Sequence, residues 1–187
     1  MSHRHPAEAT NPKETEMQNA TMETATIATY EVGDRVADFE LPDVSGKPRR
    51  LSDIAGEWTL LYFTTTWCPY CTAEAPFLET EVTEPFRDRG LRTVVVDVKE
   101  SPEVARQLPD RFGWTMPFLV DAHGEVSERF APKKEGLPPE VAVINAHFIL
   151  DSELVIRFAE YLNMERFDIR ATAVTQALDA LTGGEGR

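Results

Sequence analysis

The sequence predicts an α/β domain in which helices flank a mixed central sheet, and three observations support this prediction. Two mostly apolar, β-rich runs, WTLLYFTTT at 58–66 and LRTVVVDVK at 91–99, are typical of strands that are buried on both faces of a sheet. Apolar residues at helical spacing follow the first run, over residues 69–89. Two later stretches, 117–130 and 147–162, each combine a strand pattern with a turn and a second element. Strands that alternate with helices in this order indicate an α/β architecture.

The N-terminal part contains a predicted tail and a predicted hairpin. Residues 1–33 are rich in Thr, Glu, Ala, Asn and Met and hold few large apolar residues. We expect them to form a disordered tail, because burial cannot offset their ordering entropy. The domain is therefore expected over residues 34–184. Its first element, DFELPDVSGKPRRLS at 38–52, has the pattern of a short hairpin with Ser45 and Gly46 at the turn.

The predicted helices have recognisable ends. The helix over 69–89 ends at Gly90. Its recurring apolar residues are Phe77, Leu78, Val82 and Phe86. The stretch SPEVARQLPDRFG at 101–113 has Ser101 as an N-cap and Pro102 at the first helical position. An internal proline predicts that this second helix is weak and interrupted.

The last predicted element is a C-terminal helix, MERFDIRATAVTQALDALTGG, over residues 164–184. Its apolar side chains fall on one stripe, which consists of Phe167, Ala171, Val174, Ala177 and Leu181. The two glycines at its end are a natural stop for a helix.

Length and charge limit the classes of function. At 187 residues the chain is long enough for one domain with a full hydrophobic core and too short for two. The formal net charge of -13 argues against nucleic acid or an anionic membrane surface as a partner, because both attract Lys and Arg. No apolar run reaches the length of a membrane helix, and residues 1–30 lack the apolar core of a secretory signal. As written, the chain is expected in the cytoplasm; a periplasmic or exported protein is the alternative if the true N-terminus differs.

Both cysteines of the chain lie in WCPYC at 67–71. In a reducing cytoplasm a lone cysteine pair is rarely a structural disulfide, so the spacing favours chemistry. Cys68 stands between a predicted buried strand and the start of a helix, where unpaired N–H groups and the helix dipole stabilise a thiolate and lower its pKa. Cys71 follows one turn later on the same face and deeper in the domain. It is therefore placed to resolve a mixed disulfide formed at Cys68.

The residues around the pair support a reactive site more than a metal site. Pro69 in the first turn loses no hydrogen bond and fixes the geometry, and Trp67 can shield the thiolate from bulk water. A structural zinc site needs about four ligands, and no second Cys or His pair lies near the motif, so no metal is expected. Two inert buried cysteines remain an alternative, which the Trp-Cys-Pro-x-Cys pattern after a strand argues against.

This motif resembles the active site of the thioredoxin superfamily. Pro76, five residues past Cys71, stands where thioredoxins carry a helix-kinking proline, and Glu74 matches an acidic residue of TlpA-type thiol-disulfide oxidoreductases. Residues 32–63 resemble the N-terminal hairpin and first core strand that this group shares with the redoxin (alkyl hydroperoxide reductase/thiol-specific antioxidant) family. The resemblance covers about residues 32–182. It implies a thioredoxin-like fold with an N-terminal hairpin extension and no cofactor.

The resemblance also implies a cis-proline beside the cysteines, and two positions compete for its place. Met116-Pro117 precedes FLVDAHGEV, as in a short thioredoxin. Alternatively, NAHFILDSELVIRFAEY resembles the corresponding redoxin stretch and puts Asn145 where proline or arginine would stand. We favour Asn145, because a C-terminal helix follows that hairpin directly, as in redoxins. Pro117 then opens an ordinary strand.

Three other functions remain open. Peroxiredoxins surround their cysteine with Pro-x-x-x-Thr-x-x-Cys and a later arginine; here Thr65 fills the threonine place, but Leu61 and Asn145 replace the proline and the arginine. A peroxidase that reduces hydroperoxides as an antioxidant is therefore under-equipped. A glutaredoxin would share Cys-Pro-Tyr-Cys, with its Tyr70, but the hairpin, the length and Trp67 argue against it. A non-catalytic docking module is disfavoured because both cysteines are retained.

We therefore predict dithiol-disulfide exchange with thiol- or disulfide-bearing proteins or small thiols, supported by an electron-donor or acceptor protein. A monomer or weak dimer is expected. Cys68 attacks, Cys71 resolves, and the Pro-Tyr dipeptide tunes the reduction potential. Glu74 either accepts the proton of Cys71 or is an exposed helix-surface residue. His147 would lie near the site if Asn145 does, although such a residue is more often half-exposed on a strand, and His123 is expected to be solvated in a turn.

Overall fold

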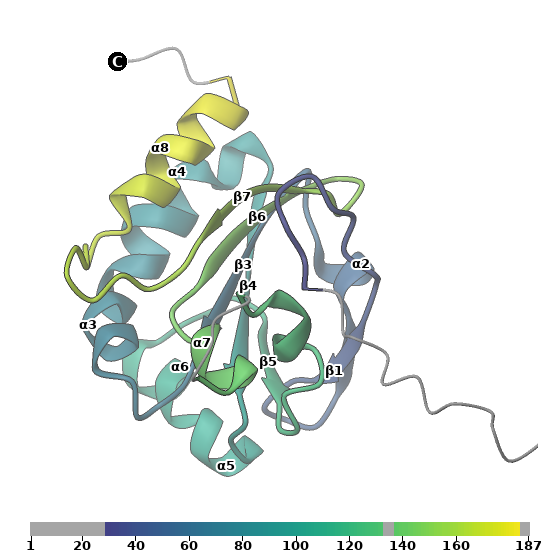
Figure 1. Ribbon diagram of the computed structural model, residues 1–187, viewed down its shortest axis with the longest axis vertical. Coiled ribbons are helices and arrows are strands. Elements are labelled where there is room, and N and C mark those ends of the chain that lie inside the picture. Colours follow the sequence, from purple (N-terminus) through teal and green to yellow (C-terminus); the bar gives the residue numbers. More distant parts are fainter. Residues whose placement is uncertain (1–28, 133–136, 184–187) are drawn as a thin grey trace, which may run out of the picture.

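The computed structural model describes residues 29–132 and 137–183 of the chain (Figure 1). The predicted disordered tail lies almost wholly outside these residues, and its disorder stays a prediction. Residues 29–33 were assigned to the tail by their composition, but they pack on the domain. The ring of Tyr30 lies with its centroid 4.9 Å from that of Phe130. The domain therefore begins slightly earlier than predicted, because Tyr30 adds an aromatic side chain to the core.

A five-stranded mixed sheet forms the centre of the domain, in the order β5-β4-β3-β6-β7. The first three of these strands are parallel, whereas β6 runs antiparallel to β3 and β7 runs antiparallel to β6. The strands are β3 (Trp58–Thr64), β4 (Leu91–Val98), β5 (Phe118–Asp121), β6 (His147–Asp151) and β7 (Ile156–Glu160). The predicted mixed sheet is confirmed, and the two buried runs form the neighbouring parallel strands β3 and β4.

A two-stranded hairpin precedes the sheet, as predicted. β1 (Glu40–Pro42) pairs with β2 (Pro48–Arg50) in antiparallel fashion, and Ser45 and Gly46 lie in the turn. Asp43 closes this turn, because its Oδ1 accepts a hydrogen bond from the N–H of Ser45 at 2.9 Å. Gly46 has φ +82°, a left-handed conformation that glycine adopts without strain.

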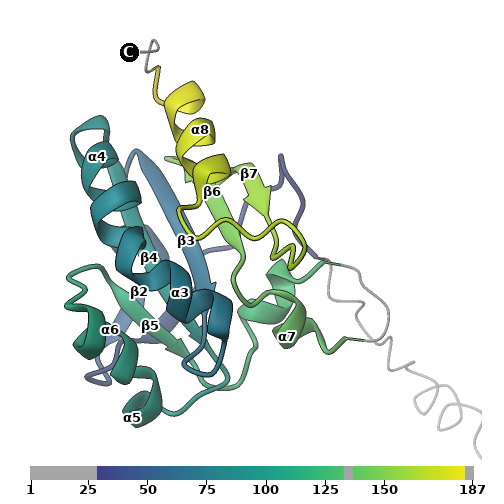
Figure 2. The same cartoon turned by 90° about the vertical axis from the view of Figure 1, so that its left-hand side faces the viewer.

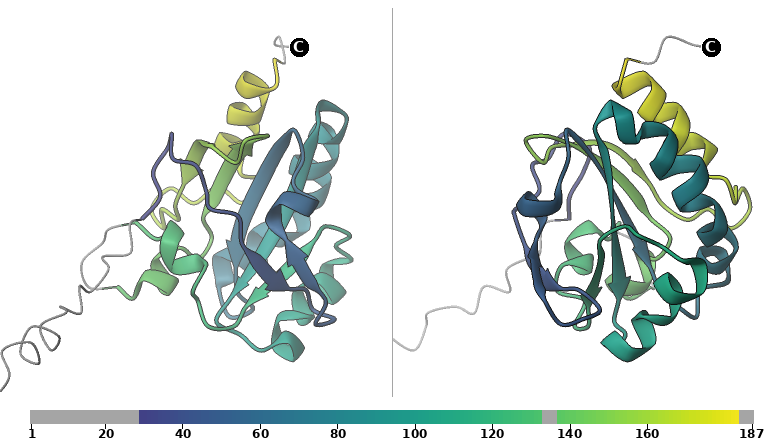
Figure 3. Two further views of the ribbon diagram at one scale, coloured as in Figure 1. Left: turned by 90° about the vertical axis from the view of Figure 1, so that its right-hand side faces the viewer. Right: turned by 180° about the vertical axis from the view of Figure 1, so that it is seen from behind.

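The sheet is covered on both faces, and alternate residues of β3 face opposite sides. Leu61 and Phe63 pack with the hairpin and the short helix α2 (Leu51–Ile54). Leu60 and Tyr62 pack with the helices of the other face. Figure 2 shows these helices, α3, α4 and α8, in front of the sheet, and Figure 3 shows the hairpin on the opposite face. Burial on both faces explains why this strand is almost uniformly apolar.

The helix predicted over 69–89 is present but irregular. It consists of α3 (Pro69–Phe77), a π-helical segment (Leu78–Thr83), α4 (Glu84–Phe86) and a 3₁₀ turn (Arg87–Arg89). Pro76 and Pro85 cannot donate the hydrogen bonds of a regular helix, and the chain responds with a wider turn between them. Gly90 ends the segment with φ +85°, as predicted.

Two shorter helical regions follow β4 and β5. The predicted proline-interrupted helix is confirmed as α5 (Pro102–Ala105) and α6 (Gln107–Phe112). After β5 the chain forms a 3₁₀ turn (Ser127–Phe130), because the Asp121 carboxylate accepts a hydrogen bond from the N–H of Ser127 at 2.7 Å. The helix α7 (Pro139–Ala142) then leads to the β6–β7 hairpin.

The C-terminal helix begins later than predicted. α8 spans Thr172–Leu181 rather than 164–184. Its start is fixed by Asp168, whose Oδ2 accepts a hydrogen bond from the N–H of Thr172 at 3.1 Å. The predicted place of Phe167 on the helical stripe is therefore wrong. Its ring instead packs edge-on against Tyr70, with the centroids 4.9 Å apart.

The carboxyl end of β3 brings together the segments that carry the predicted site. The chain passes from this end into a short loop and then into α3, which begins at Pro69. β6 starts beside the same end, where the N–H of Asn145 donates to the carbonyl of Phe63 at 2.8 Å. Within the described residues, no helix is long and apolar enough to cross a bilayer.

Candidate active site at the carboxyl end of β3

Cys68 occupies the N-cap position of α3. Its Sγ accepts a hydrogen bond from the N–H of Cys71 at 3.2 Å. A hydrogen bond from the Cys71 thiol and those from the N–H groups of Cys71 and Tyr70 lower the pKa of Cys68 to about 7, although burial and the charge of Glu74 act to raise it. A large share of Cys68 is therefore thiolate at neutral pH, and the thiolate is the nucleophilic form.

Cys71 lies one helical turn further into the domain and is 1% exposed. Burial raises the pKa of Cys71 well above its usual range, and the hydrogen bond and charge of Cys68 raise it further. The hydroxyl of Tyr62 acts in the opposite direction. Both cysteines are free thiols in this structure. The environment thus separates the two thiols into one that ionises readily and one that stays protonated.

An apolar groove of about 300 Å³ opens beside Cys68. Its walls include Trp67, Tyr70, Ile144, Leu162 and Met164. Trp67 is 61% exposed and Met164 69% exposed, so both side chains can be contacted by a partner. Trp67 is therefore an exposed wall of the groove that Cys68 also lines, and the shielding of the thiolate by Trp67 stays a prediction. Cys71 does not line the groove, so an incoming molecule meets Cys68.

The loop between β3 and α3 is held by Glu100. Its carboxylate accepts hydrogen bonds from the N–H of Thr66 at 2.7 Å and from the hydroxyl of Thr66 at 2.6 Å. Burial acts to raise the pKa of Glu100, but these hydrogen bonds outweigh it and the pKa is lowered. Asp97 is fully buried nearby, and burial followed by the charge of Glu100 raises its pKa to about 9. Thr65, the residue in the peroxiredoxin threonine place, is fully buried in the same loop.

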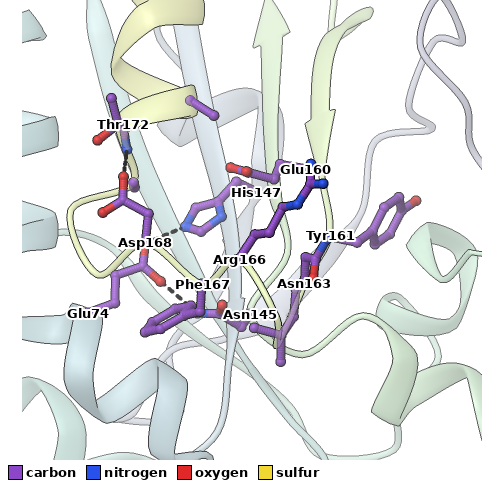
Figure 4. A pocket seen from close by; sticks show the side chains of 13 residues that line it. Glu74, Asn145, His147, Glu160, Tyr161, Asn163, Arg166, Phe167, Asp168 and Thr172 are labelled. Atoms are coloured by element: carbon purple, nitrogen blue, oxygen red, sulfur yellow. Dashed lines mark hydrogen bonds and ion pairs between the residues drawn. The ribbon is translucent and has the colours of Figure 1, made fainter.

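Glu74 is buried at the other side of the cysteines, and the exposed helix-surface alternative is wrong. The residue is 1% exposed, and both carboxylate oxygens have polar neighbours. Nδ2 of Asn145 donates to Oε2 at 2.6 Å, and Nε2 of His147 lies 2.8 Å from Oε1. Figure 4 shows the carboxylate of Glu74 between these two side chains. A carboxylate, an amide and an imidazole therefore meet one helical turn past Cys71.

Asn145 stands beside the site, and Pro117 does not. Asn145 has φ +62°, a left-handed conformation that asparagine tolerates better than most residues. Its Nδ2 also donates to the hydroxyl of Tyr62 at 3.0 Å. Pro117 lies at the start of the edge strand β5, in a surface pocket with Thr115. Within the described residues no peptide bond is cis, so neither Pro117 nor Asn145 follows a cis bond, and the assignment of Asn145 to the place of the family's proline stays a prediction.

The remaining predicted residues of the site lie on α3. Pro69 is at the first helical position, and Pro76 is inside the helix, two residues before the π-helical segment begins at Leu78. Tyr70 lines the groove next to Cys68. Among the described residues, no group of three or more His, Cys, Asp and Glu side chains is arranged to hold a metal ion. The geometry is that of two thiols with different ionisation, one apolar groove and one buried polar cluster.

The AhpC/TSA family matches residues 32–159, which is more than half of the chain. The chain belongs to the AhpC/TSA family. Its fold is the thioredoxin-like fold that the resemblance implied, with the mixed sheet and the N-terminal hairpin in place.

Named relatives of this AhpC/TSA domain include thiol-disulfide oxidoreductases and a peroxidoxin. The chain is 34% identical over 95 residues to the thiol-disulfide oxidoreductase ResA of Geobacillus kaustophilus, a match that covers 51% of this chain and 54% of that protein. It is 30% identical over 98 residues to ResA of Bacillus subtilis, covering 52% and 54%. The chain thus spans about half the length of these relatives. The crystal structure of peroxidoxin BcpB from Mycobacterium tuberculosis is 27% identical, with a TM-score of 0.65, and covers 83% of this chain and 99% of that one.

Sequence reasoning missed or misjudged several residues of this AhpC/TSA site. His147 was expected to be half-exposed, but it is 4% exposed and contacts Glu74. Tyr62 was not singled out by the sequence analysis, yet its hydroxyl lies between the amide of Asn145 and the thiol of Cys71. A signal was present, because Tyr62 carries a polar group within an otherwise apolar strand. Asp97, the charged residue in the apolar run of β4, gave a similar signal.

Proposed function

We propose that this chain is a thiol-disulfide oxidoreductase in which Cys68 attacks and Cys71 resolves. The observation that supports this most directly is the difference between the two thiols. Cys68 has a pKa of about 7 and lines an open groove, whereas the pKa of Cys71 is raised by burial and Cys71 is shut away from the groove. The ResA relatives, which are named as thiol-disulfide oxidoreductases, support the same assignment.

The reaction balances with the two thiols and one substrate disulfide. The thiolate of Cys68 attacks one sulfur of the substrate disulfide; a Cys68–substrate disulfide forms and the other substrate sulfur leaves with the electron pair. Cys71 then loses its proton and attacks the sulfur of Cys68. The Cys68–Cys71 disulfide forms, and the second substrate sulfur leaves as a thiolate. The substrate is reduced by two electrons and the protein is oxidised by two.

Glu74 is the residue we assign to the proton of Cys71. It follows Cys71 by one helical turn, it is buried with that cysteine, and its carboxylate is held in place by Asn145. Its carboxylate can act as a base for a thiol that must ionise before it attacks. The hydroxyl of Tyr62 complements this role, because it can donate to the thiolate of Cys71.

Polypeptides fit the groove better than small polar thiols as substrates. The groove beside Cys68 presents the apolar and aromatic side chains of Trp67, Tyr70 and Met164, two of them largely exposed. An unfolded or extended chain that carries apolar residues next to its cysteine can bury those residues there. The exchange itself needs no cofactor. A second protein with a thiol or disulfide must return Cys68 and Cys71 to their starting redox state after each reaction.

The test is to trap the mixed disulfide. Insulin provides disulfides on a polypeptide, and Cys71→Ser should accumulate a covalent adduct with it through Cys68. Cys68→Ser is the matched control and should form none. An adduct on Cys68→Ser and none on Cys71→Ser would reverse the two roles, and an absence of adducts on both would contradict the exchange reaction itself.

A peroxidase is the competing function that the peroxidoxin likeness raises. By the resemblance to peroxiredoxins, Leu61 and Asn145 stand where that class carries the proline and the arginine that help to polarise a peroxide. Reduced protein should therefore react with hydrogen peroxide about as slowly as an ordinary thiol of similar pKa. Stopped-flow fluorescence of Trp67 measures this rate. A rate on the order of thousands of times that of free cysteine would favour the peroxidase.

A further inference from the structure

We infer that His147 carries the Cys71 proton from Glu74 to the solvent, so that it is a proton-relay residue of the resolving step. The inference rests on the proposed exchange reaction and on the role of Glu74 in it. It concerns a side chain that lies outside the CxxC motif by sequence and beside it in space.

The backbone register places His147 in the middle of a row of three polar side chains. Tyr62 of β3 is the Cα partner of His147 of β6, and Glu160 of β7 is the Cα partner of His147 on its other side. Directly opposite residues of antiparallel strands have neighbouring side chains on the same face. The rings of Tyr62 and His147 stack with centroids 4.7 Å apart and planes 20° apart. The row thus runs from the hydroxyl near Cys71 to the partly exposed Glu160.

The contact between His147 and Glu74 is close and almost dry. Nε2 lies 2.8 Å from Oε1, and the two side chains are 5% and 2% exposed. The two atoms are in contact, but their geometry is not that of a directed hydrogen bond. A rotation of the imidazole about its last torsion, which is broad in histidine, brings the two into line.

His147 also lines a cavity, and Cys71 is not among the residues that line it. The cavity has a volume of about 180 Å³, and its lining includes Glu74, His147, Glu160, Arg166 and Asp168. Its polar walls and its size allow several water molecules to enter. Nδ1 of His147 has no hydrogen-bond partner among the described residues, so it is available to such a water.

The groups around the imidazole come from four elements. They are Glu74 from α3, Tyr62 from β3, Glu160 from β7, and Arg166 and Asp168 from the segment before α8. Burial raises the pKa of Glu160, and the charges of Glu74 and Asp168 also raise it. His147 acts in the opposite direction. An imidazole between two carboxyl groups can take a proton at one nitrogen and release another from the second nitrogen.

In the resolving reaction the proton of Cys71 passes through Glu74 and His147 in turn. The S–H bond of Cys71 breaks and its proton passes to the carboxylate of Glu74, while the Cys71 sulfur forms the disulfide with Cys68. His147 starts as the neutral imidazole with its proton on Nδ1; the proton moves from Glu74 to Nε2, and Nδ1 releases its own proton to a water of the cavity. No electrons pass through His147. When the Cys68–Cys71 disulfide is reduced again, the reverse transfer returns a proton to Cys71 and restores the starting tautomer of His147.

The experiment uses 5,5′-dithiobis(2-nitrobenzoate) as the probe, in stopped flow with reduced full-length protein. Attack by Cys68 releases the first thionitrobenzoate, and resolution by Cys71 releases the second, so the two steps appear as two phases of absorbance. In His147→Gln the side-chain amide keeps an N–H donor near Glu74 but cannot relay a proton. We expect the second phase to slow by about tenfold or more, within the range of general acid-base effects, and the first phase to change by less than about twofold. His123→Gln makes the same chemical change at an exposed turn and should leave both phases unchanged.

Chemical rescue separates a relay from a structural contact. His147→Ala enlarges the cavity, and added imidazole should restore much of the second phase. Pyrazole has the same size but is a far weaker base, so it should fill the space without restoring the rate. Equal rescue by both compounds, or a second phase of normal rate in His147→Gln, would overturn the relay. Loss of the first phase in the unmodified protein would instead contradict the proposed function, so the two failures can be told apart.

Discussion

The thiol of Cys71 should set the ionisation of Cys68, and a pair of substitutions tests this directly. The hydrogen bond from Cys71 is the largest influence on the pKa of Cys68, which is about 7 instead of the usual 9.0. Cys71→Ser keeps a hydroxyl that can donate to the Cys68 sulfur. Cys71→Ala removes the donor but keeps the backbone N–H, which lies 3.2 Å from that sulfur. The pKa of Cys68 should therefore stay low in the serine variant and rise toward 9.0 in the alanine variant.

The size of the effect follows from the thiolate population. About half of Cys68 is thiolate at pH 7 when the pKa is about 7, and about one per cent is thiolate when the pKa is 9.0. The N–H groups of Cys71 and Tyr70 remain in the alanine variant, so only part of this change is expected. Alkylation of Cys68 near pH 7 should slow by about fivefold to tenfold in Cys71→Ala relative to Cys71→Ser.

The assay is the rate of alkylation by iodoacetamide as a function of pH, followed by mass spectrometry. Each variant has one cysteine, so every adduct belongs to Cys68. Far-UV circular dichroism and thermal unfolding confirm that both variants are folded at each pH. Coincident midpoints for the alanine and serine variants would refute the reasoning, because the Cys71 side chain would then have no part in lowering the pKa.

Two further predictions concern buried polar residues of the same region. Burial raises the pKa of Asp97 to about 9, so the folded protein keeps this proton to higher pH than the unfolded chain, which loses it near 3.8. The stability that the protonated form contributes is therefore lost as the pH rises through this interval. Asp97→Asn does not titrate, so its free energy of unfolding near pH 8 should exceed that of the natural protein by about 1 kcal/mol or more. The difference should be smaller near pH 4, and urea unfolding at both pH values measures it. Because Asn145 has φ +62°, the free energy of unfolding of Asn145→Ala should be about 1 kcal/mol lower than that of Asn145→Gly. Equal free energies of unfolding for the two variants would show that the left-handed backbone is not strained.

Most of the fold could be predicted from the sequence because the deciding signals are local. The apolar runs of β3 and β4 predict strands that are buried on both faces, and the turn with Ser45 and Gly46 predicts a hairpin. The start of α8 could not be predicted from apolar spacing, since the stripe continues back to Phe167. The side chain of Asp168 ends that continuity by bonding the first turn of the helix. Composition likewise placed Tyr30 in the tail, although one aromatic side chain is enough to dock this segment.

The site was predicted as far as its motif extends. The positions of Cys68 and Cys71 at the start of a helix follow from the local sequence, and the structure has them there. The burial of His147 depends on strand register and on the segment before α8 that covers it, and neither is readable from the residues around it. The exposure of Glu74 was left open for the same reason. Whether a residue at this helix position is buried depends on side chains of β6, such as His147, which are distant from it in the sequence.

The asparagine at 145 and the buried Glu74 belong to one arrangement. A proline at this position has no N–H, so it would lose the hydrogen bond that Asn145 makes to the carbonyl of Phe63. It would also remove the amide that binds Oε2 of Glu74 and the hydroxyl of Tyr62. Glu74 would then keep His147 alone as a polar neighbour while remaining buried, which is costly for a carboxylate. A proline at 145 is therefore incompatible with the hydrogen bonds of this polar cluster, and introducing one would require a new partner for Glu74 at the same time.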